Sequence, residues 1–540
     1  MTRDVDVVVV GAGFAGLYAL HRLRSDGMTV RVLEAADGVG GVWYWNRYPG
    51  ARCDVESVDY SYSFDEQLQQ EWDWTEKYAT QPEILRYLNH VTDRFNLRPD
   101  ITFGTRVTDA VLDEGTLRWE IRTDTGEVMS ARFVVLALGP LSNANIPAIT
   151  GMESFSGNIY HTAHWPHQGV DFTGQRVGVI GTGSSGIQVI PCIAGQARQL
   201  NVFQRSANYS IPAGNVPLDD DTRRAQKAGY PERRRLSMAS GGGSPHQPHP
   251  LSALDVSEHE RRAAYEKRWQ LGGVLFSKTF PDQMLDLGAN DTARIFWEEK
   301  IRAVVDDPQT AEWLIPTDHP IGTKRICTDD HYYQTFNRDN VTLVNLRVTP
   351  IQRMDTAGVA TSASHYDLDA LVLATGFDAM TGSLDKLNIV GRGGATLNAA
   401  WSAGPITYLG LGVPGFPNVF NISGPGSPSV LANMALHSEL HVDWIAGAIG
   451  YLRAHGATAM EATRAAATDW SDECTQRAAE GLMLRANSWY LGANVPGKPR
   501  VFMPFVGGFG VYGQIIADVA AAGYKGFDLI GTERSVISSR

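Results

Sequence analysis

The chain has 540 residues and a formal net charge of −12. This length exceeds what one hydrophobic core supports, so we expect two or three domains. The acidic balance argues against nucleic acid and against an anionic membrane surface as partners, so any phosphate site must be local.

The amino-terminal segment and the cysteines predict a soluble protein of the cytoplasm. Asp6 interrupts any signal-like apolar stretch, and no window approaches the roughly 18 to 20 apolar residues that cross a bilayer. The four cysteines lie far apart and form no Cys-x-x-Cys pair. This spacing disfavours a zinc site or a redox disulfide, so we expect a reducing compartment and no metal.

The first motif in the chain is a strand, a tight turn and a helix. The apolar run Val5 to Val10 leads into Gly11-Ala-Gly13-Phe-Ala-Gly16, and a helical pattern follows. A second strand, Val30 to Leu33, ends at Glu34, about 20 residues beyond the turn, where a carboxylate meets ribose hydroxyls. The segment therefore predicts a complete dinucleotide-binding βαβ unit.

The same order recurs in the middle of the chain with one difference. The strand Arg176 to Ile180 precedes Gly181-Thr-Gly183-Ser-Ser-Gly186, and the next strand is Leu200 to Phe203. No acid follows this strand, because Arg205 and Ser206 stand in its place. A cation beside a hydroxyl suits a 2′-phosphate, so the second unit favours NADP over NAD.

One glycine-rich turn is weak evidence for a nucleotide, since such turns also make ordinary tight connections. Two such turns, each between a strand and a helix, are much stronger, because glycine lets the backbone approach a pyrophosphate that faces a helix amino terminus. We therefore predict an α/β protein with two Rossmann-like dinucleotide-binding domains.

The remaining composition suggests how the chain is divided. The strands Phe133 to Leu138 and Leu371 to Ala374 both end in glycine turns and predict crossings between the domains. We expect a first domain of residues 1–140 and 378–540, a second domain of residues 141–377, and a helical insertion at 212–320 within the second. In the insertion, Arg233-Arg234-Arg235 is expected to be a solvated helix face.

Several polar residues have no assignable role from spacing alone. His161, His164 and His167 are spaced like metal ligands, but no acid or cysteine lies nearby, so bonds to backbone are the better interpretation. Asp54 could be a turn residue, and Arg325 could be surface charge. Sequence spacing does not bring these two together.

The segment between the two glycine-rich units carries the most specific pattern. It reads Phe-x-Gly-x-x-x-His-x-x-x-Trp-Pro, with its defining positions at Phe155, Gly157, His161, Trp165 and Pro166. This pattern resembles the signature of type I Baeyer–Villiger monooxygenases, FAD enzymes that use NADPH and oxygen. Gly40 to Asp54 resembles the family's second signature, and Leu371 to Asp378 resembles its Ala-Thr-Gly crossing. The similarity extends over essentially the whole chain.

Within that family the chain is most similar to the phenylacetone and steroid (progesterone) monooxygenases, notably at Gly424 to Met434 and Val501 to Phe505. The resemblance implies that a flavin peroxide, formed with NADPH and O₂, inserts oxygen beside a ketone carbonyl to give an ester or lactone. It leaves the ketone open, whether aryl, cyclic or steroidal, and it leaves the oligomeric state open.

Three alternatives remain. A flavin-containing monooxygenase would oxidise nitrogen or sulfur centres, but those relatives usually lack Trp165 and Pro166 of the signature. A flavin disulfide reductase needs a cysteine pair, whereas Cys53 stands alone. A non-catalytic redox sensor would bind both cofactors without oxidising a substrate.

The resemblance also implies roles for individual residues. Arg325 is the catalytic cation, and Asp54 is the acid that orients it; a guanidinium stays charged and can stabilise an anion without readily giving up a proton. His161 is expected to couple the position of its segment to the position of the nicotinamide cofactor. The expected FAD contacts are Gly11, Gly13, Ala15, Gly16, Glu34, Gly41, Val42, Trp43, Asp54, Tyr60, Val107 and Met434. The expected NADP contacts are Arg52, Gly181, Thr182, Gly183, Ser184, Ser185, Gly186, Arg205, Ser206, Lys324, Arg325 and Trp489. The expected substrate pocket consists of Val55, Pro140, Leu141, Ser429, Val430 and Leu431.

Overall fold

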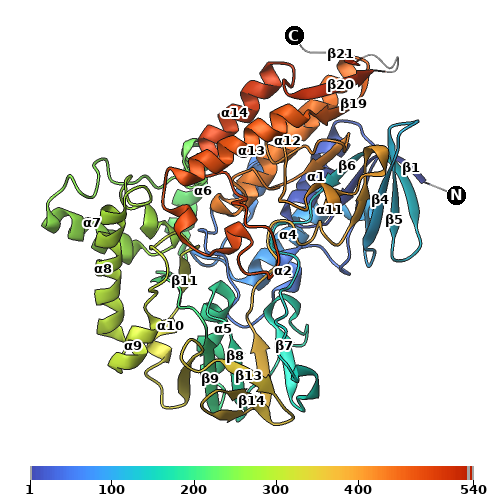
Figure 1. Cartoon of the computed structure of the whole chain (residues 1–540). Coiled ribbons are helices and arrows are strands. Elements are labelled where there is room, and N and C mark those ends of the chain that lie inside the picture. The colour runs from blue at the N-terminus through green and yellow to red at the C-terminus, as the bar shows by residue number, and fades with distance from the viewer. Residues whose placement is uncertain (1–2, 532–535, 538–540) are drawn as a thin grey trace.

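The computed structural model describes residues 3–531 and 536–537. Two sheets, each with parallel strands at its centre, lie one above the other in Figure 1, and helices cover their faces. Helices from the carboxyl-terminal part of the chain lie beside the first sheet, while a group of helices from the middle of the chain flanks the second. The predicted α/β fold with two Rossmann-like units is confirmed.

The first sheet has the strand order β17-β4-β5-β6-β1-β2-β3, with β18 also paired to β6. Its strands are β1 Arg3–Val10, β2 Val30–Leu33, β3 Ile101–Thr102, β4 Val107–Asp113, β5 Arg118–Thr123, β6 Val128–Leu136, β17 Asn388–Val390 and β18 Val419–Asn421. Strand β1 runs parallel to both β2 and β6. It is buried on both faces, which explains its unbroken run of valines.

The second sheet is wholly parallel, with the order β12-β9-β8-β16-β7. Its strands are β7 Asn158–His161, β8 Arg176–Ile180, β9 Gln199–Gln204, β12 Val341–Asn345 and β16 Ala370–Leu373. The signature segment thus supplies an edge strand, β7, followed by a short 3-10 turn at Thr162–His164. It is part of the second sheet and not an irregular linker, because β7 hydrogen-bonds to β16 along its whole length.

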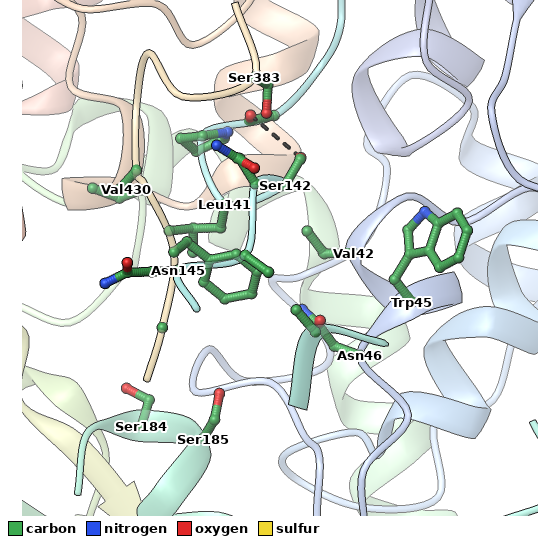
Figure 2. A pocket seen from close by; sticks show the side chains of 18 of the residues that line it. Val42, Trp45, Asn46, Leu141, Ser142, Asn145, Ser184, Ser185, Ser383 and Val430 are labelled. Carbon is green, nitrogen blue, oxygen red and sulfur yellow. Dashed lines mark hydrogen bonds between the residues drawn. The ribbon is translucent and has the colours of Figure 1, made fainter. Parts of the chain in front are cut away.

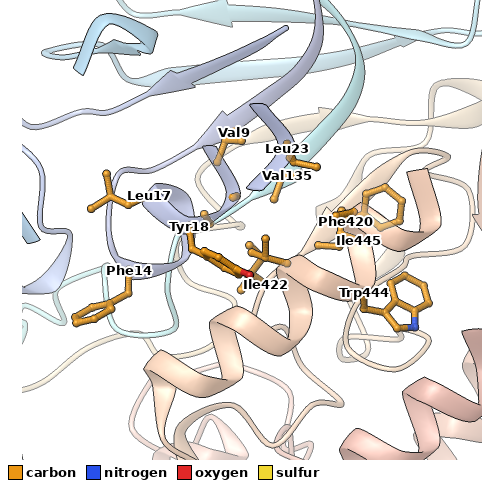
Figure 3. Close-up of a cluster of buried hydrophobic side chains, with 14 of the residues drawn as sticks. Val9, Phe14, Leu17, Tyr18, Leu23, Val135, Phe420, Ile422, Trp444 and Ile445 are labelled. Carbon is orange, nitrogen blue, oxygen red and sulfur yellow. The ribbon is translucent and has the colours of Figure 1, made fainter. Parts of the chain in front are cut away.

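The core of the first unit lies between β1 and two helices, α1 (Phe14–Ser25) and α12 (Met434–Ala454). Figure 3 shows Val9 of β1 and Leu23 of α1 in one cluster with Ile445 of α12. The other face of β1 turns Val8 toward a separate cluster that contains Trp119. Side chains alternate across a strand, so one strand stabilises both layers.

More than half of the segment 212–320 is helical. Its helices are α6 Asp220–Ala239, α7 Glu258–Leu271, α8 Leu287–Val304 and α9 Pro308–Leu314. Helices α7 to α9 form the group at one side of Figure 1, whereas α6 packs against α14 (Phe509–Ala521) and α3 (Glu66–Glu71).

The prediction that Arg233-Arg234-Arg235 is a solvated face is wrong for two of the three residues. Arg233 Nε donates to Asp59 Oδ1 at 2.6 Å, and buried Arg234 donates to the Asp59 carbonyl at 3.0 Å. Only Arg235 is largely exposed, paired with Glu232 on its own helix. Successive residues turn about 100° around a helix, so three neighbouring arginines cannot share one face.

Further short elements complete the chain. The remaining helices are α2 Val42–Trp45, α3 Glu66–Glu71, α4 Gln81–Arg94, α5 Ser184–Ala194, α10 Tyr332–Thr335, α11 Leu397–Ala400, α13 Arg464–Ala479 and α14 Phe509–Ala521. The small sheets comprise β10 Ser210–Pro212 with β11 Cys327–Asp329, β13 Ile351–Met354 with β14 Gly358–Thr361 and β15 His365–Asp367, and β19 Ala457–Ala462 with β20 Phe527–Gly531 and β21 Val536–Ile537. Within the described ranges, no helix is both long and apolar enough to span a membrane.

The two chain crossings between the sheets run side by side. Ala144 and Phe377 form an antiparallel bridge, and the Asn145 amide donates to the Gly376 carbonyl at 2.9 Å. The Asp378 amide continues the pairing with a 2.8 Å bond to the Asn143 carbonyl. The connection between the two sheets therefore consists of two chain segments that hydrogen-bond to each other, and not of two independent tethers.

Candidate functional site

A cavity of about 1640 Å³ lies between the two sheets and is lined by residues of both. Figure 2 shows that Val42, Trp45 and Asn46 of the first unit face Ser184 and Ser185 of the second across this space, with Leu141 and Val430 on another wall. The site therefore forms where the two nucleotide units meet.

The two glycine-rich turns have the same geometry. Gly11 and Gly181 adopt φ angles of 104° and 110°, which side chains rarely allow. A Cβ on Gly16 would lie 1.8 Å from the Gly11 carbonyl oxygen, and one on Gly186 would lie 2.2 Å from that of Gly181. These third glycines let helix and strand pack closely, which is why neither lines the cavity.

The middle glycine of each turn faces open space. A Cβ on Gly183 would meet nothing within 4 Å, and one on Gly13 would meet only Gly41, no closer than 3.5 Å. Both residues line the cavity at the amino termini of α5 and α1. A pyrophosphate can thus approach each backbone and helix terminus directly, so both turns fit a dinucleotide.

Glu34 is held in place by the first turn itself. Its carboxylate accepts from the amides of Ala12 at 2.6 Å and Ala36 at 2.8 Å. Burial raises the pKa of Glu34, and these two hydrogen bonds oppose the rise. The side chain borders the cavity with its orientation fixed, as recognition of a ribose diol requires.

The end of β9 carries a cluster of cations. Arg205, Ser206 and Lys324 all line the cavity, which brings together residues from two distant parts of the chain. Arg347, which sequence reasoning missed, donates to the Arg205 carbonyl at 2.9 Å and to Ser206 Oγ at 3.2 Å. Because β12 runs parallel beside β9, the two strands end at the same edge of the sheet. A prediction of this strand pairing would have placed Arg347 next to Arg205.

The expected catalytic pair meets inside the cavity. Arg325 donates from Nε to Asp54 Oδ2 at 2.7 Å and from Nη2 to Asp54 Oδ1 at 2.8 Å. A third bond, from Nη1 to the Val430 carbonyl, measures 2.6 Å. The two side chains are 27% and 20% exposed, so the pair is partly desolvated while still reaching the cavity.

The charge of Arg325 is strongly held. Burial by itself disfavours the charged guanidinium, but the adjacent Asp54 carboxylate outweighs burial and raises the pKa of Arg325. Nearby Tyr490, a second residue missed from sequence, has its pKa raised to about 12 by burial, so its hydroxyl stays protonated. The site therefore presents a permanent cation, Arg325, and the neighbouring Tyr490 does not act as a base.

His161 lies outside the cavity and contacts the second crossing segment through Thr375. Its Nδ1 accepts from the Ala163 amide at 3.0 Å, and its Nε2 lies 3.2 Å from Thr375 Oγ1. Since the Thr375 hydroxyl donates to the Asn145 carbonyl at 2.6 Å, it must accept from His161 Nε2–H. His161 is thereby a neutral tautomer that joins β7 to both crossings, and burial lowers its pKa.

The other signature residues support the second sheet. Phe155 packs against the cluster around β13 and β14, and a Cβ on Gly157 would lie 2.4 Å from the Asp369 carbonyl. Buried Trp165 packs on Tyr160 and Phe172, and Pro166 borders a separate surface pocket. None of these four contributes to the central cavity.

The remaining predicted cofactor residues all line the cavity. On the first unit these are Ala15, Gly41, Val42, Trp43, Arg52, Tyr60, Val107 and Met434, and on the second Thr182, Ser184 and Ser185, together with Trp489 of the carboxyl-terminal segment. Trp43 Nε1 donates to the Tyr60 hydroxyl at 3.1 Å, and Arg52 is paired with Glu76 at 2.9 Å.

The predicted substrate pocket is placed only in part. Val55, Pro140, Leu141 and Val430 line the cavity, whereas Ser429 and Leu431 do not. Ser429 is fully buried, with its hydroxyl bonded to the Ser423 carbonyl at 3.0 Å. Leu431 packs into the cluster around Tyr490 and Phe502. The two side chains point away because the 3-10 turn Ser429–Leu431 presents only Val430 to the cavity.

The histidines of the signature do not converge on a metal. The rings of His161 and His164 are 6.2 Å apart, while His167 packs against Tyr44. In the part of the chain that the structure describes, no three His, Cys, Asp or Glu side chains form a metal-binding group. All four cysteines are free.

Comparisons with known proteins agree with this geometry. A family model described as pyridine nucleotide-disulphide oxidoreductase matches residues 8–217. The chain is 42% identical over 529 residues to a Baeyer–Villiger monooxygenase of Pseudooceanicola batsensis, covering 96% of this chain and 95% of that protein. It is 41% identical over 542 residues to a phenazine N-monooxygenase of Lysobacter antibioticus, covering 99% and 98%.

A solved structure described as an oxidized steroid monooxygenase bound to NADP is similar over nearly its whole length. It is 71% identical to this chain, with a TM-score of 0.94, covering 97% of this chain and 99% of the other.

Proposed function

Because this chain belongs to the type I Baeyer–Villiger monooxygenases, we propose that it oxidises steroidal ketones to esters or lactones, with Arg325 and Asp54 at the centre of the reaction. The family reaction, its dependence on O₂ and its cofactors FAD and NADPH are the confirmed part of the sequence prediction. The steroidal substrate and the roles of individual residues are the proposal.

When bound, FAD and NADPH supply the reducing equivalents and activate O₂. The first glycine turn with Glu34 would hold FAD, and the second turn with Arg205, Ser206 and Lys324 would hold NADPH. The fit of each group is supported by the open space at Gly13 and Gly183 and by the opposite charges at the ends of β2 and β9.

The proposed role of Arg325 follows from counting its hydrogen bonds. A guanidinium has five N–H groups, and three of them are used by Asp54 and Val430. Of the other two, one interacts with the neighbouring Tyr490 hydroxyl, and the last is left to stabilise negative charge that develops on the ketone oxygen. A guanidinium with a raised pKa does not surrender its proton. Asp54 fixes the guanidinium plane through both of its oxygens. The bidentate pair inside the shared cavity is the observation that carries the proposal.

The steroidal substrate is proposed from two observations. A protein described as a steroid monooxygenase is 71% identical to this chain. The cavity that contains Arg325 is also lined by the apolar side chains of Val55, Leu141 and Val430, which suit a large hydrocarbon skeleton.

The test is anaerobic reduction by NADPH, followed by O₂ and a panel containing a steroid methyl ketone, an aryl ketone and a cyclic ketone. Product analysis should find the steroid ester, with the highest kcat/KM in the panel. A higher kcat/KM for the aryl or cyclic ketone would refute the steroidal assignment but not the family reaction.

Oxidation of a ring nitrogen is a second candidate activity. It is supported by the 41% identity to a phenazine N-monooxygenase over nearly the full length. Adding a phenazine to the same panel tests it, because an N-oxide and an ester differ in mass and chromatographic behaviour.

We propose the division into residues 1–140 with 378–540 and residues 141–377, with the insertion at 212–320. It is supported by β17 and β18, which return to the first sheet after the second crossing. We also propose a cytoplasmic location, supported by the four free cysteines. Limited proteolysis and fractionation of cells would test the two statements.

A further inference from the structure

One carboxylate, Asp318, lies among the cations at the end of β9. It forms an ion pair with Arg347 and lies 3.9 Å from Lys324 Nζ. His319 Nδ1 donates to its other oxygen at 2.5 Å. Asp318 thus contacts two of the three cations of the cluster formed by Arg205, Lys324 and Arg347.

This arrangement has an electrostatic reason. Burial lowers the pKa of Lys324, the Asp318 carboxylate opposes this fall, and the charges of Arg347 and Arg205 add to it. The hydrogen bond from His319, followed by the charges of Lys324 and Arg347, lowers the pKa of Asp318. A carboxylate at this place therefore offsets repulsion among cations that converge from three chain segments.

A 2′-phosphate carries about −1.5 to −2 charges at pH 7. It requires the same cations that Asp318 contacts, and it brings a like charge close to the carboxylate. Asp318 side-chain exposure is 32%, and that of Arg347 is 45%, so solvent reaches the pair and both side chains can rearrange.

We propose that Asp318 is an internal counter-ion of the 2′-phosphate site, which competes with the cofactor for Lys324 and Arg347 and so limits the affinity for NADP. The proposal rests on the assignment of the Arg205 and Lys324 cluster to the 2′-phosphate. The competing carboxylate favours release of the oxidised cofactor at the end of a cycle, and it stabilises the cation cluster between cycles.

A positioning role for Asp318 predicts the opposite change in NADP affinity. If Asp318 mainly positions Lys324 and Arg347 for the phosphate, removing its charge must weaken NADP binding. The direction of the change therefore separates competition from positioning, independently of its size.

The experiment compares FAD-loaded wild type with Asp318→Asn by calorimetric titration of NADP⁺ and NAD⁺. Removing one like charge near the phosphate is expected to tighten NADP⁺ binding about fivefold at low salt. NAD⁺, which lacks the 2′-phosphate, should change less than about twofold, and the gain for NADP⁺ should shrink at high salt. Dissociation of NADP⁺, followed by stopped flow, should slow by a similar factor.

Asp339→Asn is the matched control, since it makes the same charge change in the same domain. Asp339 is exposed, and its side chain has no ion pair or hydrogen bond among the described residues. It should leave both affinities within about twofold, as expected for a distant screened charge.

Weaker NADP⁺ binding by Asp318→Asn, or equal tightening of NADP⁺ and NAD⁺, would overturn the proposal. Lys324→Ala separates this failure from failure of the underlying assignment. If Lys324→Ala leaves the ratio of NADP⁺ to NAD⁺ affinity unchanged, the 2′-phosphate does not bind at this cluster at all. If that ratio falls while Asp318→Asn weakens binding, the cluster assignment stands and only the competing role of Asp318 is lost.

Discussion

The two glycine-rich units have the same backbone geometry in their turns. They differ in the charged side chains that follow their second strands. In the unit β1-α1-β2, a single carboxylate, Glu34, is fixed by two amides of its own neighbourhood. In the unit β8-α5-β9, Arg205 and Ser206 are joined by Lys324 and Arg347 from elsewhere in the chain, and Asp318 compensates the excess charge. The carboxylate of the first unit is held by hydrogen bonds to nearby backbone, whereas the cation cluster of the second unit is assembled from three segments of the chain.

The difference follows from the ligands that each unit suits. A ribose diol is neutral and needs one well-oriented acceptor, which a short segment can provide. A phosphate dianion needs several cations, and like charges repel when they are close in sequence and in space. The second unit gathers its cations from three segments outside the strands, with the Asp318 carboxylate beside them to offset their repulsion, and the predictions below test this contrast.

The largest expected effect comes from the glycines that both units share. Gly16→Ala should abolish FAD incorporation, because its Cβ would lie 1.8 Å from a carbonyl oxygen and force α1 away from β1. Gly186→Ala should abolish NADP⁺ binding but retain FAD. The flavin absorbance per protein and calorimetric titration of NADP⁺ measure the two outcomes.

Gly450→Ala is the control for these variants, since its added Cβ meets nothing within 4 Å. It should bind both cofactors normally. Equal loss of both cofactors in Gly186→Ala would show that the two units are not separable.

The next largest effect is on ester formation and concerns Arg325, which lies in the cavity between the two units. Arg325→Ala should lower ester formation by about 10²- to 10³-fold, as loss of a donor to a developing oxyanion does. Anaerobic flavin reduction by NADPH should continue within about tenfold of wild type, because the glycine turns and the phosphate cluster are intact. A normal ester yield from this variant would refute the catalytic role.

A smaller effect is expected from Arg205, the member of the cation cluster that directly follows β9. Arg205→Ala should lower kcat/KM for NADPH by about 10- to 30-fold, the range for a hydrogen bond to a charged group, with little change for NADH. Steady-state kinetics with both cofactors measures the ratio. Arg224→Ala, at a side chain 71% exposed, is the control. An equal loss with NADH and NADPH would place the 2′-phosphate elsewhere.

A more modest effect, on the ester formed per NADPH, is expected from His161, which contacts the second crossing segment. His161→Ala removes the Nε2–H donor to Thr375 and should lower the ester formed per NADPH by about two- to fivefold, the range for one hydrogen bond. FAD content should not change, because His161 lies outside the cavity. His161→Gln, which keeps a neutral donor, should recover part of the coupling. Unchanged coupling and NADPH kinetics in His161→Ala would count against this role.

The last effect is on stability and not on activity, and it concerns Glu439, a buried carboxylate whose pKa shifts in the opposite direction to that of Asp318. Burial raises the pKa of Glu439 from 4.5 to about 7, against the opposing hydrogen bonds of Ser63. Its folded pKa lies above the unfolded value, so its stabilising contribution is full below about pH 4.5 and is lost as the pH rises through 7. Glu439→Gln should therefore gain stability relative to wild type by about 1 to 3 kcal/mol between pH 5 and 8. Urea unfolding across this range tests the sign, and a pH-independent difference would contradict it.

Sequence patterns predicted the parts of the fold that depend on neighbouring residues. Strands β2 and β8 begin and end at the predicted residues, and both glycine turns have the expected backbone. The family resemblance then supplied Arg325 and Asp54, which spacing alone left unrelated. It also proposed Ser429 and Leu431 as lining residues, although their side chains point away from the cavity.

Other errors have the same origin. The arginine run on α6 appeared solvated because its partners, Glu56 and Asp59, lie more than 170 positions away. Arg347 and Asp318 were missed because a charged cluster built from three segments leaves no contiguous motif. In each case the deciding contact is long-range.

The sequence by itself determined two nucleotide units, the carboxylate of the first and the cation of the second, because glycine conformation, strand burial and turn geometry are local properties. Only the tertiary structure decided that Asp54 holds Arg325, that β7 is an edge strand, and that Asp318 faces the phosphate cluster. Those arrangements depend on which strand ends meet at one sheet edge and which helices pack against it, and packing joins residues that no sequence spacing relates.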